Sequence, residues 1–145
     1  MIGIIIITHG EFGKELLKTT ESITGKQNNV WCISIPQVCA LEKIKEQFRK
    51  IIDSNPSYYW IIMTDMFGGT PSNISLMDCE KRNVEVISGV NLPMLIYLFY
   101  NRALLEHHEV GEDKIKNLVN NVIIQSKESM KNIKEIFLKK LKENK

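Results

Sequence analysis

The chain of 145 residues lacks the features that define several classes of protein. It has no apolar run approaching the roughly 20 residues of a membrane-spanning helix. It begins without the basic leader, apolar core and small-residue cleavage site of a signal peptide. Its three cysteines are odd in number and show no CxxC spacing, so neither a disulfide framework nor a zinc site is expected. These absences favour a protein of the reducing cytoplasm.

A strong charge of one sign is also missing. The formal net charge is +2, with 25% charged and 43% hydrophobic residues, a balance that is typical of a folded domain and does not demand a nucleic-acid partner. No internal repeat, low-complexity tract or Pro/Gly/Ser-rich linker divides the chain. We therefore expect one domain over residues 1–145, with residues 112–145 as its C-terminal helical extension.

The chain opens on an almost uninterrupted β-branched run. Residues 2–7 read Ile-Gly-Ile-Ile-Ile-Ile, which predicts a strand covered on both faces at the centre of a parallel sheet. Three further β-rich runs follow, at residues 30–35, 58–64 and 83–88. Apolar residues at helical spacing predict helices at about residues 11–22, at 41–53, after Thr70, and up to about residue 105. From residue 112 onward, the pattern predicts either one long helix bent near residues 126–129 or two helices.

This alternation of strands and helices predicts an α/β fold, a doubly wound and mainly parallel sheet with helices on both faces. In the common strand order 2-1-3-4, the first and third strands are neighbours, and a switch point forms between their carboxyl ends. His9 ends the first strand and Asp65 ends the third. The topology alone therefore predicts that these two side chains meet.

A histidine beside a carboxylate can act as a nucleophile. The acid fixes the ring tautomer, leaves the lone pair of the other nitrogen outward and stabilises positive charge on the ring during attack. Gly68-Gly69-Thr70-Pro71 follows Asp65, and a glycine turn with Thr70 as helix N-cap and Pro71 at the first helical position suits an anion such as phosphate. The combination predicts phosphoryl transfer through a phosphohistidine. It does not predict a kinase, because the sequence shows no P-loop, kinase-type glycine loop or magnesium carboxylate pair.

Each feature has a simpler interpretation when it is taken alone. A histidine after a strand is most often a loop residue, Asp65 could cap a helix or turn, and two glycines could form a tight turn. Their predicted convergence favours the functional interpretation.

Elsewhere, the adjacent His107 and His108 predict a surface loop. The lysine-rich end of the chain predicts a solvated helix face, with a contact to a partner or a membrane surface as the alternative.

Three separated motifs carry a family resemblance. They are Ile-Thr-His9-Gly10, Thr64-Asp65-Met-Phe-Gly68-Gly69-Thr70-Pro71-Ser72-Asn73 and Gly89-Val-Asn-Leu-Pro-Met-Leu95. In order and spacing over about residues 1–105, they closely resemble the IIA component of the mannose-family (mannose/fructose/sorbose) sugar phosphotransferase system. The resemblance implies that Asp65 partners His9 and that the phosphate site is lined by Phe67, Gly68, Gly69 and Thr70.

The resemblance also implies the partners. The phosphocarrier protein HPr would phosphorylate His9, and the phosphate would pass to a IIB component and then to sugar entering through membrane subunits. Transient docking on two partners predicts an exposed, largely apolar rim around His9. The resemblance also implies a homodimer that contacts the membrane only through the transport subunits. We expect no cofactor, no metal site and no nucleic-acid partner.

The sequence departs from the family pattern in two places. The part after Arg102 does not match clearly; in the family it can supply an edge strand exchanged across a dimer, whereas here it favours helix. Some family members are fused to a IIB domain by a linker, and no linker is present here, so the IIB partner is expected to be a separate chain.

Two other functions stay open at this point. A regulatory module would keep the fold and the anion-binding pocket without the transfer, although the presence of both His9 and Asp65 argues against it. The dihydroxyacetone kinase phosphotransfer subunit resembles this family closely and would use the same domain as a phosphocarrier for another purpose.

Overall fold

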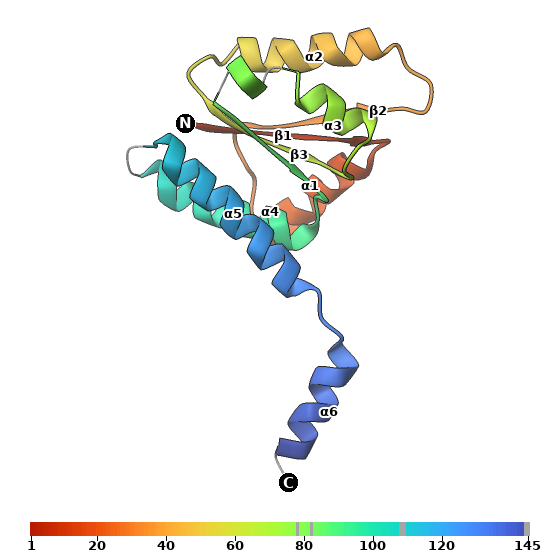
Figure 1. The fold of residues 1–145 in the computed structure, drawn as a ribbon, viewed down its shortest axis with the longest axis vertical. Helices are drawn as coiled ribbons and strands as arrows, with labels where there is room; N and C mark the ends of the chain where they lie inside the picture. The colour runs from red at the N-terminus through yellow and green to blue at the C-terminus, as the bar shows by residue number, and fades with distance from the viewer. Residues whose placement is uncertain (78, 82, 108–109, 144–145) are drawn as a thin grey trace.

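The computed structural model describes residues 1–77, 79–81, 83–107 and 110–143. They form a four-stranded sheet between two layers of helices (Figure 1). The strands are β1 (Ile2–His9), β2 (Val30–Ile35), β3 (Tyr59–Thr64) and β4 (Val84–Ser88), and the helices are α1 (Phe12–Thr24), α2 (Leu41–Asp53), α3 (Thr70–Ser75), α4 (Leu92–Glu106), α5 (Glu112–Ser129) and α6 (Ile133–Glu143), with a 3-10 turn η1 (Cys79–Lys81). Within these ranges, none of the helices combines the length and apolar composition needed to cross a bilayer.

The sheet is parallel and has the predicted order, β2-β1-β3-β4. In its register, Ile7 of β1 lies opposite Ile33 of β2 and Thr64 of β3. The carboxyl ends of β1 and β3 therefore reach the same edge of the sheet. That edge is where a ligand site is expected in an open α/β sheet.

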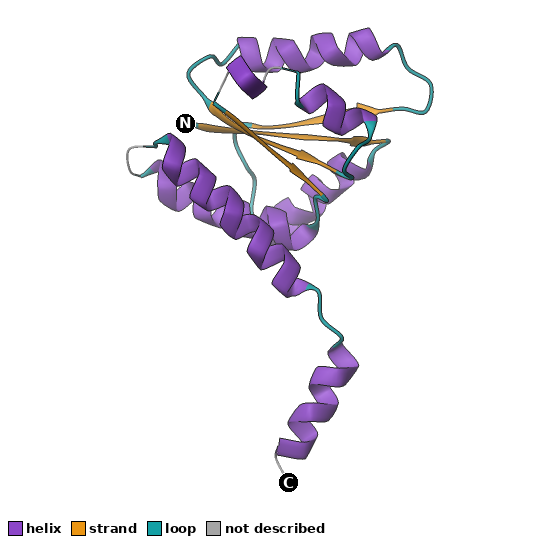
Figure 2. Ribbon diagram, viewed as in Figure 1, coloured by secondary structure: helices purple, strands orange, loops and turns teal. Residues whose placement is uncertain are grey.

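The central strand β1 is buried on both faces, as predicted. Ile4 and Ile6 pack toward α4 and α5, whereas Ile5 and Ile7 pack toward α2 and α3, because side chains alternate across a strand. Figure 2 shows these two helical layers on either side of the sheet. Each isoleucine is fully buried and contributes about 1.5–3 kcal/mol through that burial. The end of β1 that carries His9 is thus held by two hydrophobic cores.

A side-chain hydrogen bond connects the end of β1 to the start of α1. Thr8 is fully buried, and its Oγ1 accepts a hydrogen bond of 2.8 Å from the backbone N–H of Gly13. This N–H belongs to the first turn of α1, where no intrahelical acceptor exists. The bond therefore defines the short turn that follows His9. At its other end, α1 closes with Gly25 as its C-cap, at a positive φ of 83° that favours glycine.

The C-terminal segment consists of two helices, one of the two predicted alternatives. After α5 ends, Asn132 Oδ1 accepts a hydrogen bond of 3.2 Å from the N–H of Glu135, which starts α6. None of the residues 133–143 is buried, and α6 stands clear of the rest of the domain (Figure 1). His107 is exposed after α4, as predicted. His108, predicted to share that surface loop, and residues 144–145 of the predicted extension lie outside the described residues.

Replacing Thr8 with valine tests the turn. Thr8→Val keeps the shape of the side chain but leaves the buried N–H of Gly13 without its acceptor, so we expect the free energy of unfolding to fall by about 1–3 kcal/mol. Urea denaturation measures the change. The control is Thr19→Val on the exposed face of α1, for which we expect a change within about 0.5 kcal/mol. Equal losses in the two variants would contradict a role for the Thr8 hydroxyl.

Candidate functional site

The two residues predicted to meet, His9 and Asp65, are in direct contact. Oδ2 of Asp65 lies 2.8 Å from Nδ1 of the His9 ring and also 2.8 Å from the backbone nitrogen of His9. The backbone N–H of His9 lies beyond the last paired residue of β3, so the Asp65 side chain serves as its acceptor in place of a strand carbonyl. One carboxylate oxygen therefore fixes both the end of β1 and the ring that it carries.

Opposing effects determine the pKa of Asp65. Burial raises the pKa, but hydrogen bonds from the His9 backbone and ring, the charge of His9 and the N–H of Met66 together lower it below the usual 3.8. The N–H of Met66 donates to Oδ1 at 2.9 Å. Asp65 is thus ionised at neutral pH and can only accept hydrogen bonds, so Nδ1 carries the hydrogen, and in the neutral form of the ring the lone pair is on Nε2.

The ring of His9 is open to solvent while its partner is shielded. The His9 side chain is 49% exposed and that of Asp65 is 16% exposed. Nε2 has no hydrogen-bond partner among the residues that the structure describes. Across the same described ranges, no group of three or more His, Cys, Asp or Glu side chains is placed to hold a metal ion. The geometry presents Nε2 as a nucleophile to a reactant that arrives from the open edge of the sheet.

The glycine loop after β3 lies against the His9 ring. Gly68 has φ +80°, in the left-handed region that favours glycine. A Cβ atom at Gly69 would lie only 3.1 Å from Cε1 of His9, so the absence of a side chain is what permits this close approach. Ser72 Oγ donates to the carbonyl oxygen of Met66 at 2.7 Å and lies 3.2 Å from Thr64 Oγ1. These bonds hold the loop against the imidazole.

The predicted cap of α3 is wrong by one residue. Gly69 is the N-cap, Thr70 is the first helical residue, and no described side chain caps the helix. The N–H of Asn73 bonds to the carbonyl oxygen of Gly69 at 3.1 Å, so the helical ladder starts one residue earlier than predicted and Pro71 takes the second helical position. The N–H of Thr70 is one of the first N–H groups of the helix, which have no acceptor within it. Thr70 directly follows Gly69, the glycine that lies against the His9 ring.

Exposed apolar side chains lie in the loops that follow β2 and β3. Phe67, which was expected to line the phosphate site, is 86% exposed, and its neighbour Met66 is 56% exposed. Val38 is 93% exposed in the loop after β2, whose end lies beside His9 in the sheet register. We call Val38, Met66 and Phe67 the rim. The rim offers exposed apolar side chains to a partner, and docking on it stays a prediction.

The motif at residues 89–95 supports the end of β3 and the start of α4, a role that its sequence does not reveal. The N–H of Val90 donates to the carbonyl oxygen of Thr64 at 2.9 Å, directly before Asp65. Asn91 Oδ1 accepts from the N–H of Met94 at 3.0 Å and caps α4, while its Nδ2 donates to Ser126 Oγ at 2.7 Å. An asparagine just before Leu-Pro is a helix-start signal that identifies this cap in the sequence.

The fold agrees with what sequence comparison finds. A sequence model of the family described as PTS system fructose IIA component matches residues 3–116. The chain belongs to this family and is a mannose-family IIA component of the phosphotransferase system.

Individual relatives are similar over much of the chain. The fructose-specific EIIA component of Bacillus subtilis (strain 168) is 28% identical over 131 residues, which cover 89% of this chain and 84% of the relative. The mannose-specific EIIAB component of Escherichia coli (strain K12) is 39% identical over 100 residues, which cover 66% of this chain and 30% of that longer protein. The crystal structure of phosphotransferase system component EIIA from Streptococcus agalactiae has a TM-score of 0.79 at 29% identity, covering 93% of this chain and 99% of that chain.

The titration of Asp65 tests the electrostatics of the pair. Because its pKa in the folded protein is lowered, the interactions of Asp65 stabilise the fold above its usual pKa of 3.8, and this contribution is lost as the pH falls through the lowered value. We expect an NMR titration of its carboxyl carbon to have a midpoint below 3.8 and to move upward in His9→Ala. The exposed His107→Ala is the control and should leave the midpoint unchanged. An unchanged midpoint in His9→Ala would show that the ring does not act on the acid.

Proposed function

We propose that this protein is a phosphocarrier of the phosphoenolpyruvate-dependent sugar phosphotransferase system. It accepts a phosphoryl group from HPr on His9 and passes it to a IIB component during sugar uptake. The observation that carries the proposal is the 2.8 Å contact between Nδ1 of His9 and Asp65, which orients the ring so that Nε2 is open to solvent. The family membership and the names of the relatives support it.

The chemistry follows from that contact. Nε2 attacks the phosphorus of the donor, a bond from Nε2 to phosphorus forms, and the bond from phosphorus to the donor breaks with its electron pair staying on the donor. Asp65 stabilises the positive charge that develops on the ring. Gly68, Gly69 and Thr70 offer backbone N–H groups to the phosphoryl oxygens, and Phe67 lines the same site. Transfer to the IIB component is the same displacement, with Nε2 of His9 as the leaving group.

The same proposal includes how the protein meets its partners. HPr and the IIB component use the rim in turn, because both must bring a reacting group to Nε2. The chain acts as a single domain over residues 1–145, as a homodimer in the cytoplasm, and reaches the membrane only through the transport subunits. The relatives described above are named for fructose and mannose, which favours sugar uptake over the dihydroxyacetone kinase alternative. The intact His9–Asp65 pair disfavours a regulatory module without transfer.

Intact-mass analysis tests the phosphocarrier function. After incubation with phosphoenolpyruvate, enzyme I and HPr, we expect one acid-labile phosphate adduct on the wild-type protein. His9→Ala should carry no adduct, whereas His107→Ala, the matched substitution of an exposed histidine, should carry one. A wild-type protein without the adduct, in a reaction where HPr itself is phosphorylated, would refute the proposal.

Replacing the acid tests the role of Asp65. In Asp65→Ala, the ring loses the group that orients it and stabilises its charge, so we expect the rate of His9 phosphorylation to fall on the order of 100-fold or more. The fold should persist, which thermal denaturation by circular dichroism checks. Asp65→Asn keeps an oxygen acceptor for the His9 backbone and separates the loss of charge from the loss of that bond. A rate in Asp65→Ala equal to that of the wild type would remove Asp65 from the mechanism.

A further inference from the structure

A buried serine on α3 bonds to the residue that follows Asp65. Ser72 is buried, and its Oγ donates a hydrogen bond of 2.7 Å to the carbonyl oxygen of Met66. The side chain of Met66 belongs to the exposed rim, whereas its carbonyl group is turned inward to meet this hydroxyl. The proposed chemistry of His9 gives no role to Ser72. Its bond nevertheless reaches the backbone directly next to the acid of the site.

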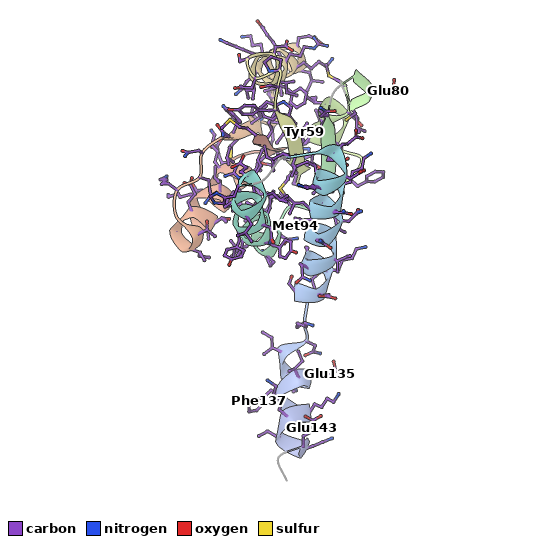
Figure 3. All side chains as sticks on the ribbon, turned by 90° about the vertical axis from the view of Figure 1, so that its left-hand side faces the viewer. Tyr59, Glu80, Met94, Glu135, Phe137 and Glu143 are labelled. Atoms are coloured by element: carbon purple, nitrogen blue, oxygen red, sulfur yellow. The ribbon has the colours of Figure 1, made fainter. Side chains whose placement is uncertain are left out.

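The end of β3 places a second hydroxyl beside Ser72. Met63 packs in the same hydrophobic core as Met94, which lies on the α4 side of the sheet in Figure 3. Side chains alternate across a strand, so Thr64 faces the opposite layer, where α3 lies. Thr64 is fully buried, and its Oγ1 lies 3.2 Å from Ser72 Oγ and 3.4 Å from the carbonyl oxygen of Met66. Because Ser72 gives its one hydrogen to Met66, only Thr64 can be the donor in the contact between the two hydroxyls.

Met66 connects this buried bond to the carboxylate. Its N–H donates to Oδ1 of Asp65 at 2.9 Å, and its carbonyl oxygen accepts from Ser72. The two backbone groups of one residue are thus held at both ends, one by the acid and the other by a buried side chain. The second carboxylate oxygen, Oδ2, accepts the two bonds from His9. A shift in the backbone of Met66 would therefore turn the carboxylate relative to the imidazole ring.

The same bond sets the direction of an N–H group in the loop. The peptide between Met66 and Phe67 is trans, so its N–H points opposite to its carbonyl oxygen. Since that carbonyl oxygen faces the buried hydroxyls, the N–H of Phe67 faces away from them. This N–H has no acceptor among the residues that the structure describes. Without the Ser72 hydroxyl, the peptide would be free to turn in search of another donor for its carbonyl oxygen, and the Phe67 N–H would turn with it.

We propose that Ser72 is a positioning residue for phosphoryl transfer at His9. Its hydroxyl fixes the backbone of Met66, which keeps Oδ1 of Asp65 and the N–H of Phe67 in the orientations that the reaction requires. Ser72 acts through Met66 and not on the reactant itself. The inference rests on the proposed function for the reaction, and one of the two experiments that test it needs no phosphoryl transfer, so the two can fail separately.

Ser72→Ala is tested against a matched control in the same helix. Ser75 is also buried, and its Oγ also donates a hydrogen bond of 2.7 Å, but to the carbonyl oxygen of Pro71 within α3. Both alanine variants lose one buried hydrogen bond of equal length, so we expect similar decreases in their melting temperatures, measured by circular dichroism. Only Ser72→Ala releases Met66.

The rate of His9 phosphorylation separates the two variants. At saturating phosphorylated HPr, we expect the rate constant to fall about tenfold in Ser72→Ala, because the acid is misaligned, and to stay at the wild-type value in Ser75→Ala. The concentration of HPr at half-saturation should not change in either variant, since the side chains of the rim are retained. Ser72→Thr restores the hydroxyl and should recover most of the lost rate, which a general loss of packing would not do.

An NMR titration of the Asp65 carboxyl carbon tests the positioning without phosphoryl transfer. Burial raises the pKa of Asp65, whereas the backbone and ring of His9 and the N–H of Met66 lower it. If Ser72 holds that N–H in place, the midpoint should be higher in Ser72→Ala than in the wild type, and unchanged in Ser75→Ala. Should HPr fail to phosphorylate the wild-type protein, the proposed function is refuted, and this midpoint alone decides whether Ser72 holds the acid.

Three results would overturn the inference. The first is a Ser72→Ala protein that is phosphorylated as fast as the wild type or keeps the wild-type midpoint for Asp65. The second is an equal loss of rate in Ser75→Ala, which would assign the effect to the stability of α3. The third is a folded Ser72→Thr protein that remains as slow as Ser72→Ala, because the hydroxyl would then not be the group that matters.

Discussion

The bonds from the Asp65 carboxylate to His9 are the interaction on which the candidate site depends. One oxygen accepts hydrogen bonds from the backbone N–H and from Nδ1 of His9, and the other oxygen accepts one from Met66. The orientation of the ring is therefore coupled to the end of the central strand. An imidazole held only by a flexible loop could rotate freely, whereas rotation here breaks a bond to an ionised acid. The surrounding structure preserves this coupling: Thr8 holds the start of α1, and Val90 holds the end of β3.

The contact between His9 and Asp65 was predictable because it follows from topology. Runs of β-branched residues at positions 2–7, 30–35 and 58–64 identify the strands, and the common order of a doubly wound sheet makes the first and third of them neighbours. Two residues 56 positions apart in the sequence then share one edge of the sheet. The bounds of α2 and β2 agree with the predicted ones, since strong periodicity and Pro36 mark them.

Other features could not be predicted because they depend on individual hydrogen bonds and on small residues. Periodicity locates α1, but Gly13 and Thr20 are the residues buried on it, and a search for large apolar residues overlooks them. Two hydrogen bonds leave no pattern in the sequence. One is accepted by the carbonyl oxygen of Gly69 and makes this residue the cap of α3, and the other is donated by the backbone N–H of His9 to Asp65. In contrast, the start of α6 can be recognised in the sequence, because Asn132 and Glu135 have the spacing of a capping box.

The isoleucines of β1 are packed between two cores, and this packing limits how far a phosphoryl group on His9 could alter the shape of the protein. Every residue from 4 to 7 is fully buried, so the backbone beneath His9 has no room to shift in response to a group added at its exposed ring. In the proposed cycle, the loaded and unloaded forms would then have nearly the same shape and would differ mainly by the negative charge of the phosphoryl group. Donor and acceptor would have to distinguish the two forms by electrostatic potential, and salt concentration would affect that discrimination more than it affects the apolar contacts of the rim.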